Sequence, residues 1–141
     1  MNIAFICVAN SARSQMAEAM ARAMAPLGVS IFSAGSRPTR VHPLAIEAMT
    51  EVGLDISSYQ SKGFDAIPKN MDVVIRLCAE ENCPTALAQC EQYHWPIDDP
   101  AAVSANDSPH FQKQKFNLAR EQLREKLQHY FRRMDDSPMP E

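Results

Sequence analysis

The sequence predicts an α/β protein with an open, mostly parallel four-stranded sheet and helices on both faces of that sheet. Short apolar runs alternate along the chain with segments in which apolar residues recur every three or four positions, the pattern of strands followed by helices. The chain has 141 residues, of which 45% are hydrophobic, and this suits one compact domain with a single core. We expect that domain over residues 1–134 and a frayed tail over residues 135–141.

The first third of the chain has the pattern of a strand, a loop, a helix and a second strand. Residues 2–7 (NIAFIC) form a continuous apolar run, which indicates a short buried strand. Apolar residues then recur at helical spacing over residues 16–27, where a proline and a glycine end the helix. Residues 29–35 (VSIFSAG) predict the second strand. This order is typical of the opening of a parallel βαβ fold.

The middle of the chain continues the alternation. A helix is expected over residues 44–52, where a glycine ends it. Residues 71–77 (MDVVIRL) are rich in β-branched residues and predict a third strand. A short fourth strand is expected over residues 93–97, and Pro96 limits it to a sheet edge or a strand end.

The last predicted element is a long amphipathic helix. Its apolar residues keep a spacing of three or four from Phe116 to Met134. Arginines at other positions, of which Arg120 is the first, are expected on the solvated face of this helix.

Composition excludes several classes of function. The formal net charge is −3 and no basic block is present, so nothing supplies the electrostatic footprint of a nucleic-acid binder. The N-terminus (MNIAFICVAN) has no basic region and only a short apolar run, so we expect a soluble cytoplasmic protein without membrane association. Its four cysteines would lie in a reducing compartment, where cysteines serve catalysis, redox exchange or metal binding more often than structural disulfides.

The loop between the first strand and the first helix carries the strongest chemical signal. Such a loop can turn several backbone N–H groups inward and form an anion-binding nest, which the helix dipole reinforces. The same field favours the thiolate form of Cys7, and the planar guanidinium of Arg13 can bind two oxygens of an oxyanion. Asn10 tolerates a left-handed conformation, and Ser14 can donate a hydrogen bond to the Cys7 sulfur. The predicted oxyanion-binding residues are Val8, Ala9, Asn10, Ser11, Ala12, Arg13 and Ser14.

These residues resemble a known family. CVANSARSQMAEAM is similar to the phosphate-binding loop and first helix of the low-molecular-weight tyrosine phosphatase fold, which also serves thioredoxin-coupled arsenate reductases. The resemblance continues through SAGSRPTRVHPLAIEAM, GLDISSYQSK, VVIRLCAEENCP and HWPIDDPA, and so covers roughly residues 2–102. It implies a low-molecular-weight phosphatase-like fold.

The resemblance also implies roles for single residues. The Cys7 thiolate attacks a tetrahedral oxyanion, Arg13 stabilises the added charge, and Asp99, which precedes a proline, donates a proton. In arsenate reductases a second cysteine attacks the first, expels arsenite and leaves a disulfide, and a third cysteine then attacks the second. Cys78 and Cys83 match these two positions, although Cys90 is a further thiol that can replace Cys83 as the recycling thiol.

We therefore expect a cytoplasmic arsenate reductase that acts through a Cys7 adduct and a disulfide cascade. The expected ligands and partners are arsenate or a phosphate-like oxyanion, and thioredoxin or a similar thiol reductant. No bound cofactor and no metal are expected, and turnover requires the external reductant. Lys62 stands where some of these reductases carry an acidic residue that helps to bind potassium, so we expect no potassium site.

Two other functions remain open at this stage. A low-molecular-weight protein tyrosine phosphatase would hydrolyse phosphoesters through a cysteinyl-phosphate. Its aromatic wall after the Asp-Pro pair is replaced by Ala101 and Ala102, which disfavours a phosphotyrosine substrate. A zinc-binding module is the other alternative, with ligands at Cys78, Cys83, Cys90 and His94, but it would leave Cys7 and Arg13 unexplained.

Overall fold

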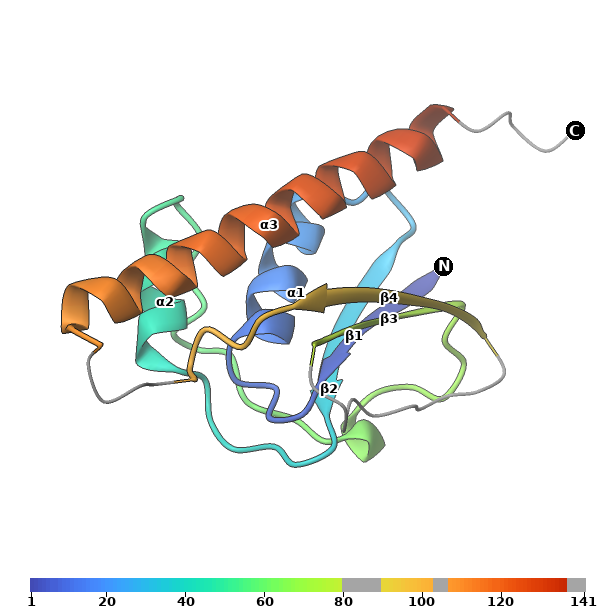
Figure 1. Cartoon of the computed structure of the whole chain (residues 1–141). Coiled ribbons are helices and arrows are strands. Elements are labelled where there is room, and N and C mark those ends of the chain that lie inside the picture. Colours follow the sequence, from blue (N-terminus) through green and yellow to red (C-terminus); the bar gives the residue numbers. More distant parts are fainter. Residues whose placement is uncertain (80–89, 103–106, 137–141) are drawn as a thin grey trace, which may run out of the picture.

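The computed structural model describes residues 1–79, 90–102 and 107–136, with residues 135 and 136 described by their backbone only. The elements follow one another as strand β1, helix α1, strand β2, helix α2, a short 3₁₀-helix η1, strands β3 and β4, and helix α3 (Figure 1). Their bounds are β1 Asn2–Cys7, α1 Arg13–Met24, β2 Ser30–Gly35, α2 Pro43–Thr50, η1 Phe64–Ala66, β3 Val73–Cys78, β4 Glu91–Ile97 and α3 Pro109–Asp136.

The four strands form one sheet in the order β2-β1-β3-β4, and each pair of neighbours is parallel. The chain moves from β1 outward to β2 and then returns to place β3 on the other side of β1. In open α/β sheets, ligands bind beyond the carboxyl ends of the strands at such a reversal. The end of β1 at Cys7 and the end of β3 at Cys78 flank this point, so the topology itself selects their edge of the sheet.

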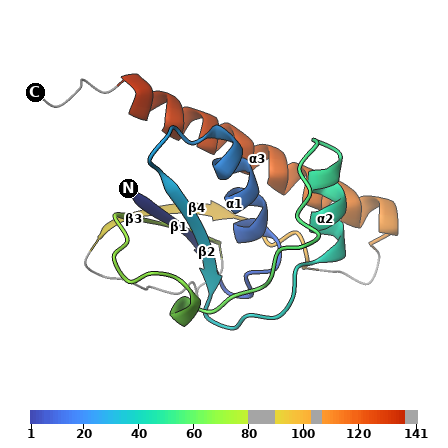
Figure 2. The same ribbon diagram turned by 180° about the vertical axis from the view of Figure 1, so that it is seen from behind.

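The helices α1, α2 and α3 pack together on one face of the sheet (Figures 1 and 2). Ile3, Phe5 and Ile75 point into the core on this side, where α3 contributes Phe116, and the side chains of all four are essentially inaccessible to solvent. The opposite face is covered in its described part by η1 and the segment after it. Burial on both faces explains why the central strands are continuous apolar runs rather than alternating ones.

The predicted fold class is confirmed, with some corrections of detail. Helices were expected on both faces, and the three α-helices lie on one face, whereas the described part of the other face carries only the short 3₁₀-helix η1. β4 begins two residues earlier than expected and holds Pro96 on the edge strand, as its missing N–H requires. Helix α3 begins at Pro109 rather than Phe116, because Ser108 accepts a hydrogen bond from the backbone N–H of Phe111 (3.0 Å) and proline suits the first helical position.

A second correction concerns an arginine that we expected in solvent. The Arg120 side chain is only 11% exposed, and its guanidinium donates to the backbone oxygen of Ala48 at 2.8 Å. It also pairs with Glu51 at 3.4 Å. Arg120 therefore joins α3 to the end of α2, and its charge satisfies a carbonyl that the helix end leaves without a partner.

A wide hollow lies between β4 and the C-terminal half of α3, away from the loop that follows β1. It encloses about 1270 Å³ and is lined by Tyr93, Trp95 and Tyr130 among others. Tyr130 makes edge-on contacts with both other rings, at 6.0 and 5.9 Å between ring centroids.

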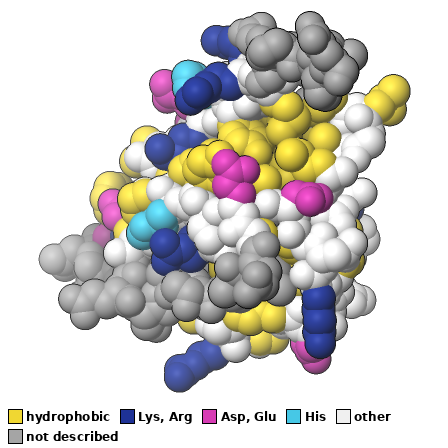
Figure 3. Space-filling model, turned by 90° about the vertical axis from the view of Figure 1, so that its right-hand side faces the viewer, with side chains coloured by type: hydrophobic (Ala, Val, Ile, Leu, Met, Phe, Trp, Pro, Cys, Tyr) yellow, Lys and Arg dark blue, Asp and Glu magenta, His cyan; other side chains and the backbone are white. Residues whose placement is uncertain are grey.

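Hydrophobic side chains also gather on the side of the molecule where the strands begin (Figure 3). Among the described residues, no helix is long and apolar enough to span a membrane.

Candidate active site

The segment from Val8 to Ala12 leads from the end of β1 into α1 as a tight loop. Each carbonyl group from Val8 to Ser11 accepts a hydrogen bond from a donor outside the loop. The donors are, in order, the backbone N–H of Arg37 (2.8 Å), the backbone N–H of Thr39 (3.2 Å), the side chain of Gln15 (3.2 Å) and the backbone N–H of His42 (3.0 Å). Because a trans peptide points its N–H opposite to its C=O, the four amides that follow these carbonyls turn toward the other side of the loop.

The inner side of the loop faces a small pocket of about 260 Å³. Its lining comprises Cys7, Val8, Ala9, Ser11, Ala12, Arg13, Asp99 and Ala101. No side chain caps the first turn of α1 at Ala12, so this end of the helix keeps N–H groups for another acceptor. Converging amides, a helix N-terminus and a guanidinium together favour a bound oxyanion.

Asn10 holds the loop in shape from inside the protein. Its φ angle of 48° is left-handed, a conformation that asparagine tolerates, and its side chain is fully buried. The side-chain oxygen accepts from Gln15 Nε2 and from the backbone N–H of Lys62, both at 2.8 Å, while its nitrogen donates to Ser14 (2.7 Å) and Ser33 (3.0 Å). All its polar atoms are engaged, which fixes both the amide orientation and the left-handed backbone.

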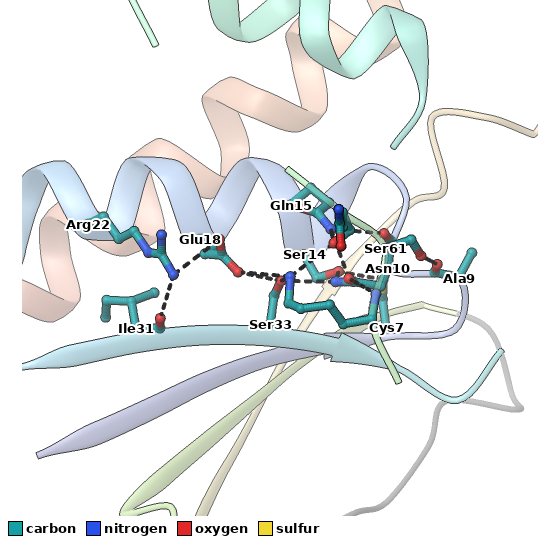
Figure 4. A network of polar contacts seen from close by, with 12 residues as sticks. Cys7, Ala9, Asn10, Ser14, Gln15, Glu18, Arg22, Ile31, Ser33 and Ser61 are labelled. Carbon is teal, nitrogen blue, oxygen red and sulfur yellow. Dashed lines mark hydrogen bonds and ion pairs between the residues drawn. The ribbon is translucent and has the colours of Figure 1, made fainter. Parts of the chain in front are cut away.

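The Cys7 sulfur lies at the base of the pocket, where the residue is 2% exposed. Its Sγ is 2.9 Å from Ser14 Oγ. Ser14 Oγ also accepts from Asn10, and its own hydroxyl proton can be donated to the sulfur when Cys7 is a thiolate, which has no proton to give. Figure 4 shows the three side chains in this order.

Arg13 opens α1 and is 5% exposed. Its guanidinium donates to the backbone oxygen of Ile97 at 2.8 Å, which ties it to the end of β4. The sheet thus holds this charge beside the pocket, and the guanidinium geometry suits two oxygens of one oxyanion.

The Asp-Pro segment follows directly after β4. Asp99 lines the pocket and accepts a hydrogen bond from the backbone N–H of Ala101 at 2.9 Å, whereas Asp98 is exposed and lines none of it. Ala101 forms part of the pocket wall. The structure therefore brings Cys7, Arg13 and Asp99 together, although they are up to 92 residues apart in the chain.

Cys78 ends β3 and is fully buried, but it faces away from Cys7. Phe5 and Leu77 belong to the core on the helical side, and side chains alternate along a strand. Cys7 therefore points to the helical side, as its contact with Ser14 shows, and Cys78 points to the other. The carbonyl oxygen of Cys78 accepts a hydrogen bond from His94 Nε2 at 2.6 Å.

Of the other two cysteines, only Cys90 belongs to the described part of the chain. Cys83 lies outside the described residues. Cys90 is half-buried before β4, and burial raises the pKa of its thiol. Among the described residues, no group of three or more His, Cys, Asp or Glu side chains is placed to hold a metal ion. A zinc site with His94 as a ligand would have to use its Nδ1, since its Nε2 is hydrogen-bonded to the backbone carbonyl of Cys78.

Sequence reasoning missed Gly35, which ends β2 opposite Cys7. A Cβ atom at Gly35 would lie 2.5 Å from the oxygen of Val8 and 2.8 Å from the nitrogen of Asn10, so the loop packs directly on its backbone. A glycine at the end of a strand beside a predicted anion loop was the available signal.

We predict that Gly35→Ala destabilises the protein by about 1–3 kcal/mol and weakens phosphate binding, because the new methyl group pushes the oxyanion loop aside. Thermal unfolding and calorimetric phosphate titration measure the two effects. Gly28→Ala is the matched control. Its φ of 89° strains alanine, but no atom lies within 4 Å of the new Cβ. The control should lose stability while keeping its phosphate affinity, and equal affinities in both variants would contradict the role of Gly35.

His42 fixes the other side of the loop and caps α2. Its backbone N–H donates to the carbonyl oxygen of Ser11. Its Nδ1 accepts a hydrogen bond from the backbone N–H of Leu44 at 3.0 Å, so this nitrogen must be unprotonated. Burial, followed by the nearby charge of Arg40, lowers the pKa of His42 from 6.5, and Asp99 opposes this shift. A lowered pKa in the folded state means that the stabilisation is fully present above about pH 6.5 and is lost as the pH falls through the folded value.

We predict that the free energy of unfolding falls more between about pH 7.5 and about pH 5 in the wild type than in His42→Asn, by up to about 1 kcal/mol. Asparagine keeps a cap acceptor but does not titrate. Urea unfolding at both pH values measures the difference. The same slope in both proteins would mean that His42 is not the titrating cap.

The chain was compared with known proteins. Residues 2–137 match a family model described as low molecular weight phosphotyrosine protein phosphatase. A relative from Staphylococcus saprophyticus subsp. saprophyticus, named arsenate reductase 2, is 38% identical over 132 residues, which cover 92% of this chain and 95% of the relative.

Solved structures similar to this chain carry the same name as that relative. One described as an arsenate reductase in oxidized state has a TM-score of 0.77 and 32% identity, over 94% of this chain and 97% of the other. Another, described as an arsenate reductase in the phosphate binding state, has a TM-score of 0.73 and 31% identity over the same shares.

Proposed function

This chain belongs to the low molecular weight phosphotyrosine protein phosphatase family. Because its relatives and structural neighbours reported above are named arsenate reductases, we propose that it is an arsenate reductase, an enzyme that reduces arsenate to arsenite with thiol electrons. One observation carries the proposal. A cradle for a tetrahedral oxyanion closes over a cysteine at the end of β1, and a second buried cysteine ends the neighbouring strand β3.

The first step forms a bond between Cys7 and arsenic. The Cys7 thiolate attacks arsenate, and one arsenate oxygen leaves as water after it is protonated. Asp99 lines the same pocket and is the proposed proton donor to that oxygen. Arg13 and the inward amides of residues 9–12 stabilise the negative charge that builds up on the remaining oxygens.

The second step moves two electrons to arsenic. The Cys78 thiolate attacks the Cys7 sulfur, the electron pair of the sulfur–arsenic bond stays with arsenic, and arsenite leaves. Cys7 and Cys78 are thereby oxidised to a disulfide. Since the two side chains point to opposite faces of the sheet, this step requires the end of β3 to leave its place, which breaks the hydrogen bond from His94 to the Cys78 carbonyl.

The last steps restore Cys7. The proposed recycling thiol, Cys83, attacks Cys78, releases the Cys7 thiolate and leaves a disulfide between Cys78 and Cys83. Thioredoxin, or a similar dithiol, then reduces this disulfide by two further exchanges. Cys90 is the weaker candidate for the recycling role, because its raised pKa leaves less of the nucleophilic thiolate near neutral pH.

The phosphatase alternative receives less support. Hydrolysis of phosphotyrosine would use the same cradle, but Ala101 supplies no aromatic surface in the described pocket wall. The relatives reported above carry the name of the reductase.

The proposal is tested by assaying the full chain with arsenate, thioredoxin, thioredoxin reductase and NADPH, and separately with an aryl phosphate. We expect NADPH oxidation that depends on both arsenate and thioredoxin, and little aryl phosphate hydrolysis. Peptide mapping after one arsenate turnover without reductant should show Cys78 in a disulfide. Strong hydrolysis of the aryl phosphate without arsenate-dependent NADPH oxidation would overturn the proposal in favour of the phosphatase.

A further inference from the structure

Glu18 of α1 is a buried carboxylate that the proposed reaction does not use. It is 3% exposed and lies behind the oxyanion loop. Its Oε1 accepts the hydroxyl proton of Ser33 at 2.6 Å. A buried charge is costly unless opposite charges and hydrogen bonds compensate it. The question is therefore which cation lets Glu18 remain ionised there.

Lys62 supplies a cation from the loop before η1. Its Nζ lies 3.5 Å from Glu18 Oε1, 3.4 Å from Ser33 Oγ and 3.0 Å from the backbone oxygen of Gln60. Three oxygens from three different segments thus surround one ammonium group, whose side chain is 27% exposed. Arg22 also pairs with Glu18, through Oε2 at 3.5 Å, but its side chain is 51% exposed.

The same residue holds the oxyanion loop through its backbone. The Lys62 N–H donates to Asn10 Oδ1 at 2.8 Å, and its carbonyl oxygen accepts from the N–H of Gly35 at 2.9 Å. Gly35 is the residue on which the loop packs. Lys62 therefore touches both the buried carboxylate and the two residues that shape the loop.

A continuous line of hydrogen bonds leads from Glu18 to the Cys7 sulfur (Figure 4). Ser33 donates to Glu18 and accepts from Asn10, Asn10 donates to Ser14, and Ser14 lies at 2.9 Å from Cys7. The charge of Glu18 sets which atoms donate along this line. An ionised Glu18 can only accept, so the Ser33 hydroxyl donates its single proton to the carboxylate. The Ser33 oxygen is then left as an acceptor for Asn10, which in turn keeps its second amide proton for Ser14.

We propose that Lys62 is a positioning residue whose ammonium group is the built-in counter-ion of Glu18, and that it thereby holds Asn10, Ser14 and the Cys7 thiolate in their reactive arrangement. The proposal rests on the proposed function only in taking Cys7 as the reacting thiol. It concerns the reactivity of that thiol and the affinity of the loop for oxyanions, whichever reaction follows.

A consequence is that the protein needs no dissolved cation at this place. When the ammonium group is removed, the oxygens of Glu18, Ser33 and Gln60 are left around a space that a small cation can enter. Exogenous ammonium should then restore what Lys62→Met loses, while the wild type should be indifferent to it.

The experiment compares Lys62→Met with Arg22→Met, which removes the other cation from the same carboxylate. Two readouts are independent of arsenate chemistry: the rate of Cys7 alkylation by iodoacetamide at neutral pH, located by peptide mass, and the dissociation constant of inorganic phosphate. Lys62→Met should slow alkylation and weaken phosphate binding roughly 3- to 30-fold. Ammonium at about 100 mM should reverse both losses, and tetramethylammonium at equal ionic strength should not.

Two further variants separate the role of the Lys62 charge from a general loss of folding. Arg22→Met should change either readout less than about twofold, since a largely exposed ion pair contributes little. Lys62→Arg retains the charge and should remain within a few-fold of the wild type even if Lys62→Met folds poorly. The proposal is overturned if Lys62→Met matches the wild type, if Arg22→Met loses as much, if Lys62→Arg shows a full loss, or if phosphate binding by the wild type requires added potassium or ammonium.

Discussion

Cys7→Ser is expected to lower arsenate turnover roughly 10⁴-fold or more, because the reaction loses the sulfur that is proposed to bond to arsenic. A serine hydroxyl is far less acidic than a thiol and stays protonated near neutral pH. Beside Ser14 it would form a hydrogen bond between two neutral hydroxyls. Coupled NADPH oxidation with arsenate measures the loss.

The same variant should still bind phosphate within a few-fold of the wild-type affinity. The cradle consists of backbone amides and Arg13, and none of these depends on sulfur. Calorimetric titration with phosphate is therefore the control for folding. A variant that binds phosphate and also reduces arsenate at a normal rate would show that another cysteine performs the attack.

The sequence was a good guide to the elements that create the site. Short apolar and β-branched runs predicted all four strands within two residues at each end. In the central strands β1 and β3 such runs arise because burial on both faces leaves little room for polar residues. The left-handed backbone of Asn10 agrees with the tolerance noted from the sequence, since few residue types other than glycine adopt that conformation readily. Local chemistry thus located the loop between β1 and α1.

The support around the loop was not predictable in the same way. Glu18, Ser33 and Lys62 lie on α1, on β2 and in the loop before η1, and no spacing in the sequence links them. Their relation exists only after the strands have paired. Arg120 illustrates the same limit, because its helical position predicted solvent whereas the neighbouring end of α2 supplies a carbonyl partner.

The orientation of Cys78 also depends on the folded sheet. Sequence placed Cys7 and Cys78 at the same edge, and the parallel pairing of β1 with β3 agrees with that expectation. Only the two core clusters reveal that their side chains point to opposite faces. In the proposed reaction, capture of the oxyanion would therefore need no movement of β3, whereas its reduction by Cys78 would.

Cys78→Ser is therefore expected to separate the two halves of the reaction. Arsenate capture and phosphate binding should remain within a few-fold of the wild type, because the cradle keeps every residue. Thioredoxin-dependent arsenate reduction should fall roughly 10³-fold or more, since the variant lacks the thiolate proposed to attack the Cys7 adduct. Steady-state NADPH oxidation and quantification of arsenite released in a single turnover measure the loss.

Cys83→Ser and Cys90→Ser complete the series and distinguish the remaining steps. Without the recycling thiol, one equivalent of arsenite should still be released and the enzyme should stop as a disulfide between Cys7 and Cys78. We expect this arrest in Cys83→Ser and near-normal turnover in Cys90→Ser, since burial raises the pKa of the Cys90 thiol. The reverse pattern would assign recycling to Cys90. Full turnover in Cys78→Ser would rule out Cys78 as the attacking thiol, because the electrons for arsenite would then come from another cysteine of the chain or directly from the external thiol.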